Sequence, residues 1–256
     1  MKRFAAKEAS DDVVLTVVCA MRNVEHCVEG FLDSYRSQRT SKTQLIVIDG
    51  ASADGTWAIL ERYWEIIHLA VSEADRGIYD AWNKALPMCT GRYVSFIGAD
   101  DRIADGGLGH LVAACRDDKS KPHIIAGFNI LTKNEVPVLL LGAPYDSARF
   151  NRQMMIAHVM CAHRLDWLVS VRGFDASYRS SGDYELLLRE HASLRVETLN
   201  VVLAYMEDGG ASRTSLRPIF ENYRARLSNG IPLWLCVVLL ARALLGRVGR
   251  GIGLRK

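Results

Sequence analysis

The sequence predicts an α/β fold in which a mostly parallel central sheet is flanked by helices. Short apolar segments alternate with segments of helical periodicity, and acidic residues directly follow two of the apolar segments. A chain of 256 residues that is 49% hydrophobic and 24% charged has the composition of an ordinary globular protein with a full core. Ligands of open α/β sheets bind at the carboxyl edge, so the strand-end acids mark a predicted site.

Two strand–helix units open the chain. Residues 13–20 (VVLTVVCA) form an apolar strand, followed by a helix with one apolar face. That face consists of Val24, Cys27, Phe31 and Tyr35. Residues 44–48 (QLIVI) form the next strand, and residues 56–70 form a helix after it. The apolar stripe of this second helix, which we assign to core packing and not to ligand binding, consists of Trp57, Leu60, Trp64 and Ile67.

The alternation continues and then weakens. The next elements predicted are a short strand at residues 68–71, a helix at residues 78–88 and a buried strand at residues 93–97. Residues 123–141 then form strand segments, which we predict to be antiparallel because Lys133 and Asn134 make a turn between them. Residues 180–192 form a helix opened by Ser-Gly-Asp. The nucleotide-binding type of pattern therefore lies in the N-terminal half.

Charge and cysteine content exclude several classes of protein. A net charge of +3 gives no reason to expect nucleic acid as a partner. The six cysteines lie in or beside apolar segments without a CxxC pair, which indicates buried free thiols in a reducing compartment and neither zinc nor disulfides. The N-terminus has no apolar segment before Asp11 and Asp12, so it is not a secretory signal. We therefore expect the chain to stay inside the cell.

The acids at strand ends are the candidate ligand-binding groups. Asp100 and Asp101 follow the strand at residues 93–97, and a divalent cation would offset their mutual repulsion and bind phosphate oxygens. A solvated Asp-rich turn is the alternative interpretation of this pair. Asp49 follows the strand at residues 44–48, where its carboxylate could accept hydrogen bonds from a base or ribose. Ser52 or Asp54 is expected to cap the helix that comes next, so these two side chains are assigned to structure.

Five segments in order carry a resemblance to a known family. They read TVVCAMRN, LIVIDGASADGT, SEADRGIYDAWNKAL, GRYVSFIGADD and GFDASYRSSGDYELLLR. This succession, over residues 13–215, resembles the inverting family 2 glycosyltransferases of the GT-A fold, particularly polysaccharide-assembly members with a GIYDAMNKG string. The resemblance implies transfer of a sugar from a nucleotide diphosphate donor, usually a UDP-sugar, with Mn²⁺ or Mg²⁺ on the diphosphate. It also implies a smaller acceptor-side part beside the sheet.

The resemblance assigns roles to the strand-end acids. Asp49 matches the acid that contacts the base, Asp100 the acid near the ribose, and Asp101 the metal-binding acid of a DxD-like motif. The first acid of that motif is replaced here by Ala99, which leaves Asp101 as the metal ligand.

Asp183 is the candidate catalytic base. Inverting transfer is a single displacement, so a carboxylate must take the proton of the acceptor hydroxyl. Asp183 matches the family acid in GDYELLLR, whereas local sequence alone favours a helix N-cap at this position. Glu185 lies two residues further on and is expected to point elsewhere, which makes it the reserve candidate.

Other residues of the matched segments are weaker candidates for the donor site. Arg76 and Asn83 belong to the segment DRGIYDAWN and are assigned to nucleotide-sugar binding, although Arg76 also fits a solvated charge. His158 matches a family histidine that binds diphosphate or acceptor, but the glutamine that usually follows it is absent here. Gly209 and Gly210 resemble a late glycine turn in which backbone groups approach the donor phosphates, and they also suit any tight turn.

The C-terminal segment is considered apart from the transferase domain, which we place at residues 1–230. Residues 231–256 contain an apolar run too short to cross a bilayer, with Arg242, Arg247 and further basic residues around it. This pattern is typical of a helix lying in an anionic membrane surface, and a helix packed on the domain or on a second subunit is the alternative.

These observations lead to one expected function and its rivals. We expect an inverting hexosyl- or N-acetylhexosaminyltransferase that acts on a glycan or lipid-diphosphate-linked acceptor, at the cytoplasmic face of a bacterial membrane. A subunit that binds nucleotide sugar without turning it over is the alternative. A dinucleotide-binding enzyme is disfavoured because the first strand is followed by Ala-Met-Arg-Asn and not by GxGxxG.

Overall fold

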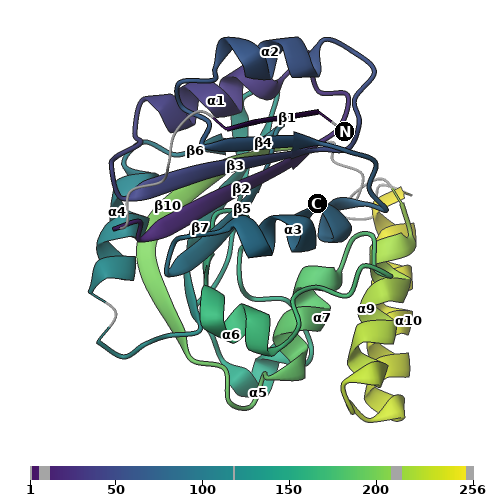
Figure 1. Ribbon diagram of the computed structural model, residues 1–256. Helices are drawn as coiled ribbons and strands as arrows, with labels where there is room; N and C mark the ends of the chain where they lie inside the picture. Colours follow the sequence, from purple (N-terminus) through teal and green to yellow (C-terminus); the bar gives the residue numbers. More distant parts are fainter. Residues whose placement is uncertain (1, 6–11, 118, 209–214, 252–256) are drawn as a thin grey trace.

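The protein consists of one twisted sheet with helices on both faces (Figure 1). The computed structural model describes residues 2–5, 12–117, 119–208 and 215–251, and for residues 248–251 it describes the backbone alone. The arrangement confirms the predicted α/β class with a mostly parallel central sheet.

The sheet combines a parallel N-terminal half with a mixed C-terminal half. Its strands are β1 (Lys2–Ala5), β2 (Leu15–Met21), β3 (Thr43–Asp49), β4 (Leu69–Ser72), β5 (Tyr93–Gly98), β6 (Arg102–Ile103), β7 (Ile124–Lys133), β8 (Val136–Leu141), β9 (Ala162–Arg164) and β10 (Val196–Glu207). They follow the order β1-β4-β3-β2-β5-β9-β7-β10-β6, with β8 paired to β7. Strands β2 to β5 are parallel to their neighbours in this group, as are β7 and β10, whereas β1, β6, β8 and β9 run antiparallel to the strands beside them.

Helices form the two outer layers. They are α1 (Val28–Arg36), α2 (Thr56–Arg62), α3 (Ile78–Ala85), the 3-10 turn η1 (Leu86–Met88), α4 (Gly107–Arg116), α5 (Ser147–Phe150), α6 (Leu165–Ser170), α7 (Gly182–Arg189), α9 (Arg217–Ser228) and α10 (Leu233–Gly251). Helices α1, α2 and α4 share one apolar core with the sheet, and α3, α6 and α7 share the other. Figure 1 shows these two groups on opposite sides of the strands.

Strand β2 lies at the centre of the parallel half, and every one of its residues is buried. Apolar side chains on both faces of a strand are expected where helices cover both sides of a parallel sheet. The chain passes from β2 to β3 and β4 in one direction, and β5 then joins β2 on its other side. The strand order therefore reverses between β2 and β5, and the carboxyl ends of these two strands frame the ligand-binding edge.

The predicted strands are present, and so is the predicted hairpin. The short segment at residues 68–71 forms β4, and residues 123–141 form the antiparallel pair β7 and β8. Asn134 and Glu135 take positive φ angles at the tip of this hairpin, as tight hairpin turns require. Helix α7 occupies the middle of the predicted helix at residues 180–192.

The helix predicted for residues 56–70 is too long. Helix α2 ends at Arg62, and Leu69 already pairs with β3, which requires an extended chain. Trp57, Leu60 and Ile67 are buried as predicted, whereas Trp64 lies after the helix and is 57% exposed. The assignment of Trp64 to the core is therefore wrong. The sequence also gave no sign of β1, which adds an antiparallel edge strand beside β4.

The C-terminal part forms a pair of helices at one edge of the molecule. Helix α9 contacts α7, and α10 in turn contacts α9 (Figure 1). In the part of the chain that the structure describes, none of the helices has the length and apolar character needed to span a bilayer.

Candidate active site

Two adjoining cavities open at the carboxyl ends of β2 and β5. One has a volume of about 750 Å³ and extends from Met21, at the end of β2, and Arg22, after it, to Asp75 and Asp100. The other has a volume of about 720 Å³ and continues from Asp100 toward α7. Both are lined by Gly98, Asp100 and residues of two other segments, so they form one crevice. Its position is the one expected where the strand order of an open sheet reverses.

The second cavity brings four of the predicted site residues together. Asp100 and Asp101 follow β5, His158 precedes β9, and Asp183 lies in the first turn of α7. These residues come from three distant parts of the sequence. The cavity therefore combines a pair of carboxylates with a separate carboxylate on a helix, in a space large enough for a ligand of small-molecule size.

Asp101 is a buried acid beside a second carboxylate, that of Asp100. Burial raises the pKa of Asp101 to about 8, with a further contribution from the negative charge of Asp100. Hydrogen bonds from the backbone of Gly98 and Glu207 act in the opposite direction. Two neighbouring carboxylates of this kind offer hard oxygen ligands, and a divalent cation would relieve the repulsion that raises the pKa. The residues present therefore fit Mn²⁺ or Mg²⁺.

Glu207, at the end of β10, places a third acid beside this pair. It lines the same cavity as Asp101. Its carboxylate accepts hydrogen bonds of 2.7 Å from the hydroxyl of Thr132 and from the backbone N–H of Asn134. The sequence analysis did not single out Glu207, because it did not predict the strand β10 that ends at this residue.

Asp183 faces the cavity and is not a helix cap. The N-cap residue of α7 is Ser181, and the backbone N–H groups that lead up to the helix, those of Arg179, Ser180 and Ser181, donate to the carboxylate of Glu221 at 2.9, 2.7 and 2.9 Å. The capping interpretation of Asp183 is therefore wrong. Its carboxylate accepts a hydrogen bond of 3.2 Å from the hydroxyl of Tyr79. Burial raises the pKa of Asp183, and the bond from Tyr79 partly opposes that shift.

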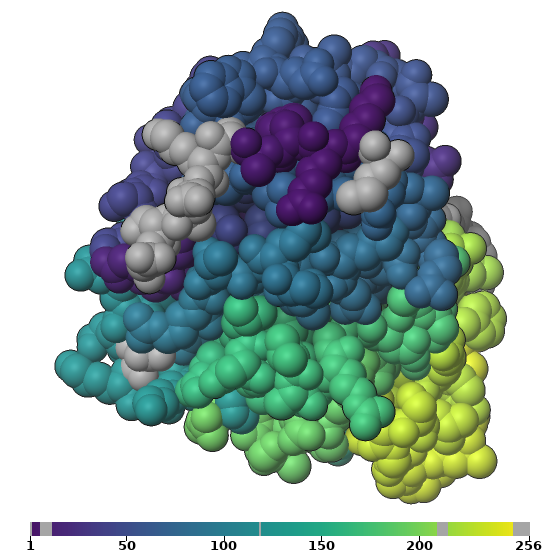
Figure 2. Space-filling model, in the orientation of Figure 1, coloured from purple at the N-terminus to yellow at the C-terminus, as the bar shows by residue number. Residues whose placement is uncertain are grey.

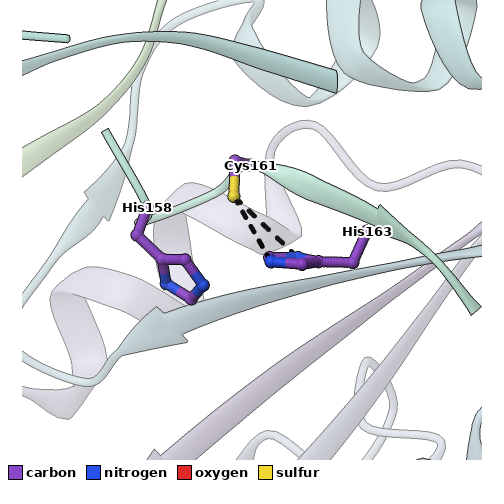
Figure 3. A group of neighbouring side chains, drawn as sticks. All are labelled: His158, Cys161 and His163. Atoms are coloured by element: carbon purple, nitrogen blue, oxygen red, sulfur yellow. Dashed lines mark hydrogen bonds between the residues drawn. The ribbon is translucent and has the colours of Figure 1, made fainter. Parts of the chain in front are cut away.

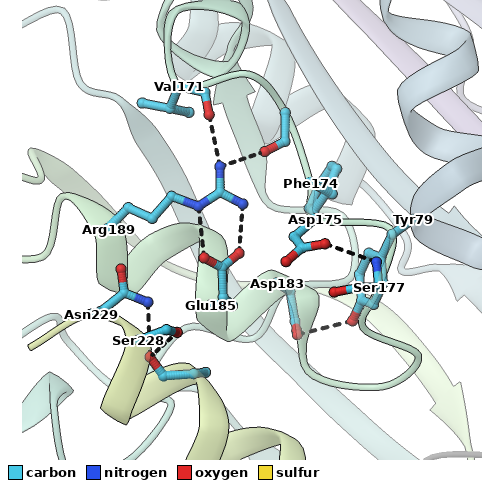
Figure 4. A network of polar contacts seen from close by, with 12 residues as sticks. Tyr79, Val171, Phe174, Asp175, Ser177, Asp183, Glu185, Arg189, Ser228 and Asn229 are labelled. Carbon is cyan, nitrogen blue, oxygen red and sulfur yellow. Dashed lines mark hydrogen bonds and ion pairs between the residues drawn. The ribbon is translucent and has the colours of Figure 1, made fainter. Parts of the chain in front are cut away.

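Glu185 points away from the cavity, as predicted. Its two carboxylate oxygens accept hydrogen bonds from Arg189, at 2.8 and 2.5 Å (Figure 4). The same guanidinium donates to the carbonyl oxygens of Val171 and Gly173, at 2.7 and 2.9 Å. This network holds the loop before α7 behind Asp183. Glu185 is thus a structural residue, and it is no longer needed as a reserve base.

The carboxylate of Asp49 accepts its hydrogen bonds from within the protein. Asp49 has no exposed surface, and its carboxylate accepts hydrogen bonds from the backbone N–H and the hydroxyl of Ser52 and from the hydroxyl of Ser72. The carboxylate that lines the crevice nearby belongs to Asp75, which lies over Gly50. The prediction that Asp49 contacts the nucleotide base is therefore corrected. In this structure Asp75 presents its carboxylate where a nucleotide could reach it. Of the two capping candidates, Asp54 is the one that accepts a hydrogen bond from the first turn of the helix, from the backbone N–H of Thr56.

The predicted contacts of Arg76 and Asn83 are also revised. Arg76 lines the first cavity, but its guanidinium is paired with Asp80 at 2.9 Å and extends into solvent. Asn83 lies outside the crevice lining, and its side-chain amide bonds the backbone N–H and carbonyl of Phe174. Arg179 lines both cavities and is the cation placed to approach a ligand there.

His158 belongs to a packed group of rings and a thiol. Its ring stacks on Trp82, and burial lowers the pKa of His158 to about 3, so the ring is neutral at physiological pH. Its Nε2 atom has no hydrogen-bond partner among the described residues. A neutral ring can form a hydrogen bond with a ligand, but it brings no positive charge to a diphosphate.

Cys161 and His163 lie beside His158, with all three donor atoms within 4.8 Å of one another (Figure 3). The Sγ atom of Cys161 is 3.9 Å from both ring nitrogens of His163. A sulfur equidistant from the two nitrogens lies off the lone-pair direction of each, so this contact is packing of a thiol against a ring. The arrangement does not fit a zinc site. Gly209 and Gly210, assigned to the donor phosphates, lie outside the described residues.

Comparison with known proteins identifies the family. Residues 16–164 match the family described as Glycosyl transferase family 2. The chain belongs to this family. A PGL/p-HBAD biosynthesis glycosyltransferase of Mycobacterium bovis (strain BCG / Pasteur 1173P2) is 26% identical over 90% of this chain and 90% of its own length.

Two further comparisons cover a bacterial enzyme and a solved structure. The UDP-Glc:alpha-D-GlcNAc-diphosphoundecaprenol beta-1,3-glucosyltransferase WfgD of Escherichia coli is 30% identical over 36% of each chain. The crystal structure of S. aureus TarS 1-349 in complex with UDP-GlcNAc covers 91% of this chain and 72% of its own, with a TM-score of 0.66 and 18% identity. The glycosyltransferase therefore has the GT-A fold, as predicted.

The site of this transferase contains residues that the sequence analysis missed. Asp75 follows β4 by a few residues, so the same strand-end signal that marked Asp49 could have found it. Tyr79 and Arg179 carried no such signal, because each becomes part of the crevice only when distant segments pack together. Glu207 ends a strand that the sequence analysis did not predict. Asp100, Asp101 and Asp183, which the sequence analysis singled out, line one cavity.

Proposed function

We propose that the protein transfers a sugar, with inversion, from a nucleoside diphosphate donor to a hydroxyl of a glycan or lipid-diphosphate-linked acceptor in bacterial glycan synthesis. The observation that carries the proposal is the shared cavity of Asp100, Asp101 and Asp183 at the point where the strand order reverses. A relative that uses UDP-Glc and a solved structure that holds UDP-GlcNAc support a UDP-sugar as the donor to test first.

The two halves of the crevice suit the two parts of the donor. The first cavity, with Arg22, Asp75 and Arg179, would take the nucleotide, and Asp75 would accept a hydrogen bond from the base. The second cavity would take the sugar and the reacting hydroxyl. Asp100 lines both and would lie beside the ribose and diphosphate, where the two halves meet.

A divalent cation would be held by Asp101 with Asp100 beside it. When bound, such an ion neutralises negative charge on the diphosphate. The preference for carboxylate oxygen supports Mn²⁺ or Mg²⁺ over softer metals. Arg179 adds a protein-borne positive charge at the same crevice.

Asp183 would act as the general base in a single displacement. Its carboxylate takes the proton of the acceptor hydroxyl as the acceptor oxygen bonds to the anomeric carbon. The bond between that carbon and the diphosphate oxygen breaks, and the nucleoside diphosphate leaves with the electron pair. The raised pKa of Asp183 makes its carboxylate a stronger base than an exposed aspartate, which favours proton transfer near neutral pH.

The proposal is tested by release of nucleoside diphosphate from a panel of UDP- and GDP-sugars, with and without Mn²⁺ and with lipid-diphosphate-linked saccharide acceptors. Acceptor-dependent release, with an anomeric configuration opposite to that of the donor by NMR, is the expected result. Tight donor binding without release from any donor and acceptor pair would instead identify a subunit that binds nucleotide sugar without turnover.

A further inference from the structure

A third cavity lies apart from the catalytic crevice, between the turn after α5 and helix α10. It has a volume of about 620 Å³ and shares no lining residue with the two catalytic cavities. Three arginines line it, Arg149 from α5, Arg152 from the turn after α5 and Arg242 from α10. The other described residues of its lining are uncharged, so within that part of the chain the cavity concentrates positive charge and has no acid in its lining.

The three guanidinium groups are available to a ligand. Arg149, Arg152 and Arg242 are exposed, and their side chains form no hydrogen bond or ion pair with another of the described residues. Like charges placed around one cavity repel, and a phosphate group would relieve that repulsion. Guanidinium groups are well suited to this ligand because their N–H donors match two phosphate oxygens at once.

Hydrogen bonds from neighbouring helices hold the backbone that carries two of these arginines. The hydroxyl of Tyr184 donates to the carbonyl of Phe150 at 2.8 Å. The buried side chain of Arg226, on α9, donates to the carbonyls of Asn151 and Arg152 at 3.0 and 2.9 Å. The turn is therefore held against α9, which also packs against α10. The site is formed before any ligand arrives, so binding does not have to order it.

Helix α10 exposes an apolar stripe next to the cavity. Its exposed apolar side chains are Leu233, Trp234, Val237, Val238 and Leu245, with exposures between 48% and 71%. At about 100° per residue these positions fall on one side of the helix, and Arg242 lies at the border between that side and the cavity. Figure 2 shows the helix (yellow) at the molecular surface, beside the green segments of the domain.

We propose that the cavity of Arg149, Arg152 and Arg242 binds the head-group phosphate of an anionic membrane lipid while the apolar stripe of α10 enters the acyl boundary of the same surface. Apolar and cationic groups side by side on a helix that does not combine the length and apolar character needed to span a bilayer have the chemistry of an interfacial helix. The unbalanced positive charge beside the stripe favours an anionic lipid over a second protein chain as its occupant. This inference does not depend on the transferase reaction.

The test is sedimentation of the full chain with phosphatidylcholine vesicles that contain, or lack, phosphatidic acid. The triple variant Arg149→Ala, Arg152→Ala, Arg242→Ala should lose anionic vesicle binding by about fivefold for each arginine removed. The matched control is Arg116→Ala, which removes an exposed arginine at the end of α4 and should bind as the unchanged chain does. Equal binding of the triple variant and the unchanged chain to anionic vesicles would overturn the proposal.

Two further measurements separate lipid from other occupants. Brominated lipid should quench tryptophan fluorescence of the unchanged chain, and Trp234→Phe should remove most of that quenching. Soluble pyrophosphate should give little protection against thermal unfolding, since the apolar stripe contributes only on a membrane. Arginine-dependent protection by pyrophosphate equal to that by lipid would show a free phosphate site. A dimer in solution that Trp234→Glu disrupts would show that the stripe is a protein interface. Either result contradicts the proposal.

Discussion

The hydroxyl of Tyr79 donates a hydrogen bond to the carboxylate of Asp183, although 104 positions separate the two residues in the sequence. Both residues line the sugar half of the crevice, Tyr79 from α3 and Asp183 from α7 (Figure 4). The approach requires glycine at position 182, because a Cβ atom there would lie 2.8 Å from the Tyr79 ring. The bond therefore orients the proposed base relative to the donor.

We predict that Asp183→Asn slows sugar transfer by about a hundredfold or more and leaves donor affinity unchanged. The amide keeps the shape of the side chain and still accepts the Tyr79 bond, but it cannot take a proton. Calorimetric titration with the nucleotide and steady-state rates measure the two effects separately. A matched control is Glu185→Gln, which breaks the ion pair with Arg189 and should alter stability more than transfer. A parallel loss of affinity and rate in Asp183→Asn would show that the residue has a structural role.

The same variant should be more stable than the unchanged chain at neutral pH. Burial raises the pKa of Asp183 above its unfolded value, so the folded state favours the protonated form. This contribution to stability is present at low pH and is lost as the pH rises through the folded pKa, where the carboxylate must ionise in a buried position. Asparagine avoids that cost. The melting temperature of Asp183→Asn should therefore exceed that of the unchanged chain at pH 7, with a difference that shrinks at low pH.

Tyr79→Phe should move the acid limb of the rate profile to higher pH. The Tyr79 bond lowers the pKa of Asp183, so its removal raises that pKa, and the base is ionised only at higher pH. The measurement is kcat as a function of pH with saturating donor and acceptor. A residue that only supports the fold would lower the rate at every pH and leave the limb in place.

Strand-end acids were predictable from sequence, and their surroundings were not. Asp100 and Asp101 lie at the crevice because a buried strand delivers them there, which hydrophobic patterning indicates. Asp49 lies at an equivalent strand end, yet Ser52 and Ser72 occupy its carboxylate. Sequence alone cannot tell an acid that faces a ligand from one that neighbouring hydroxyls have already satisfied.

The role of Asp183 shows the same limit. Aspartate at the start of a helix is a good cap by local rules, but in the folded chain Ser181 is the N-cap residue of α7, and Glu221 on α9 binds the three N–H groups that lead up to the helix. The core assignment of Trp64 was wrong for a related reason. The apolar spacing in the sequence continues past the end of the helix, because β4 pairs with β3 and requires an extended chain. Contacts between distant segments decide these cases, and local patterns do not record them.

Asp101→Asn should abolish the metal dependence of donor binding and leave the fold intact. The substitution removes one of two adjacent carboxylates, and with it the charge that would hold a cation. UDP affinity measured with and without Mn²⁺ should differ for the unchanged chain and coincide for the variant. The control is Glu207→Gln, whose carboxylate already bonds Thr132 and Asn134 and which should keep the metal effect. Retained metal dependence in Asp101→Asn would remove this residue from the metal site.

Asp75→Asn and Asp49→Asn should have different effects, because only the first carboxylate lines the crevice. Asp75→Asn should weaken UDP affinity about tenfold, the loss expected for one hydrogen bond to a charged group, with little change in stability. Asp49→Asn should lower the free energy of unfolding by about 1 to 3 kcal/mol, because Ser52 and Ser72 lose a buried charged acceptor. Urea unfolding and UDP titration of both variants measure these effects. Unchanged UDP affinity in Asp75→Asn would show that the base does not bind over Gly50 and would return Asp49 as the candidate for that contact.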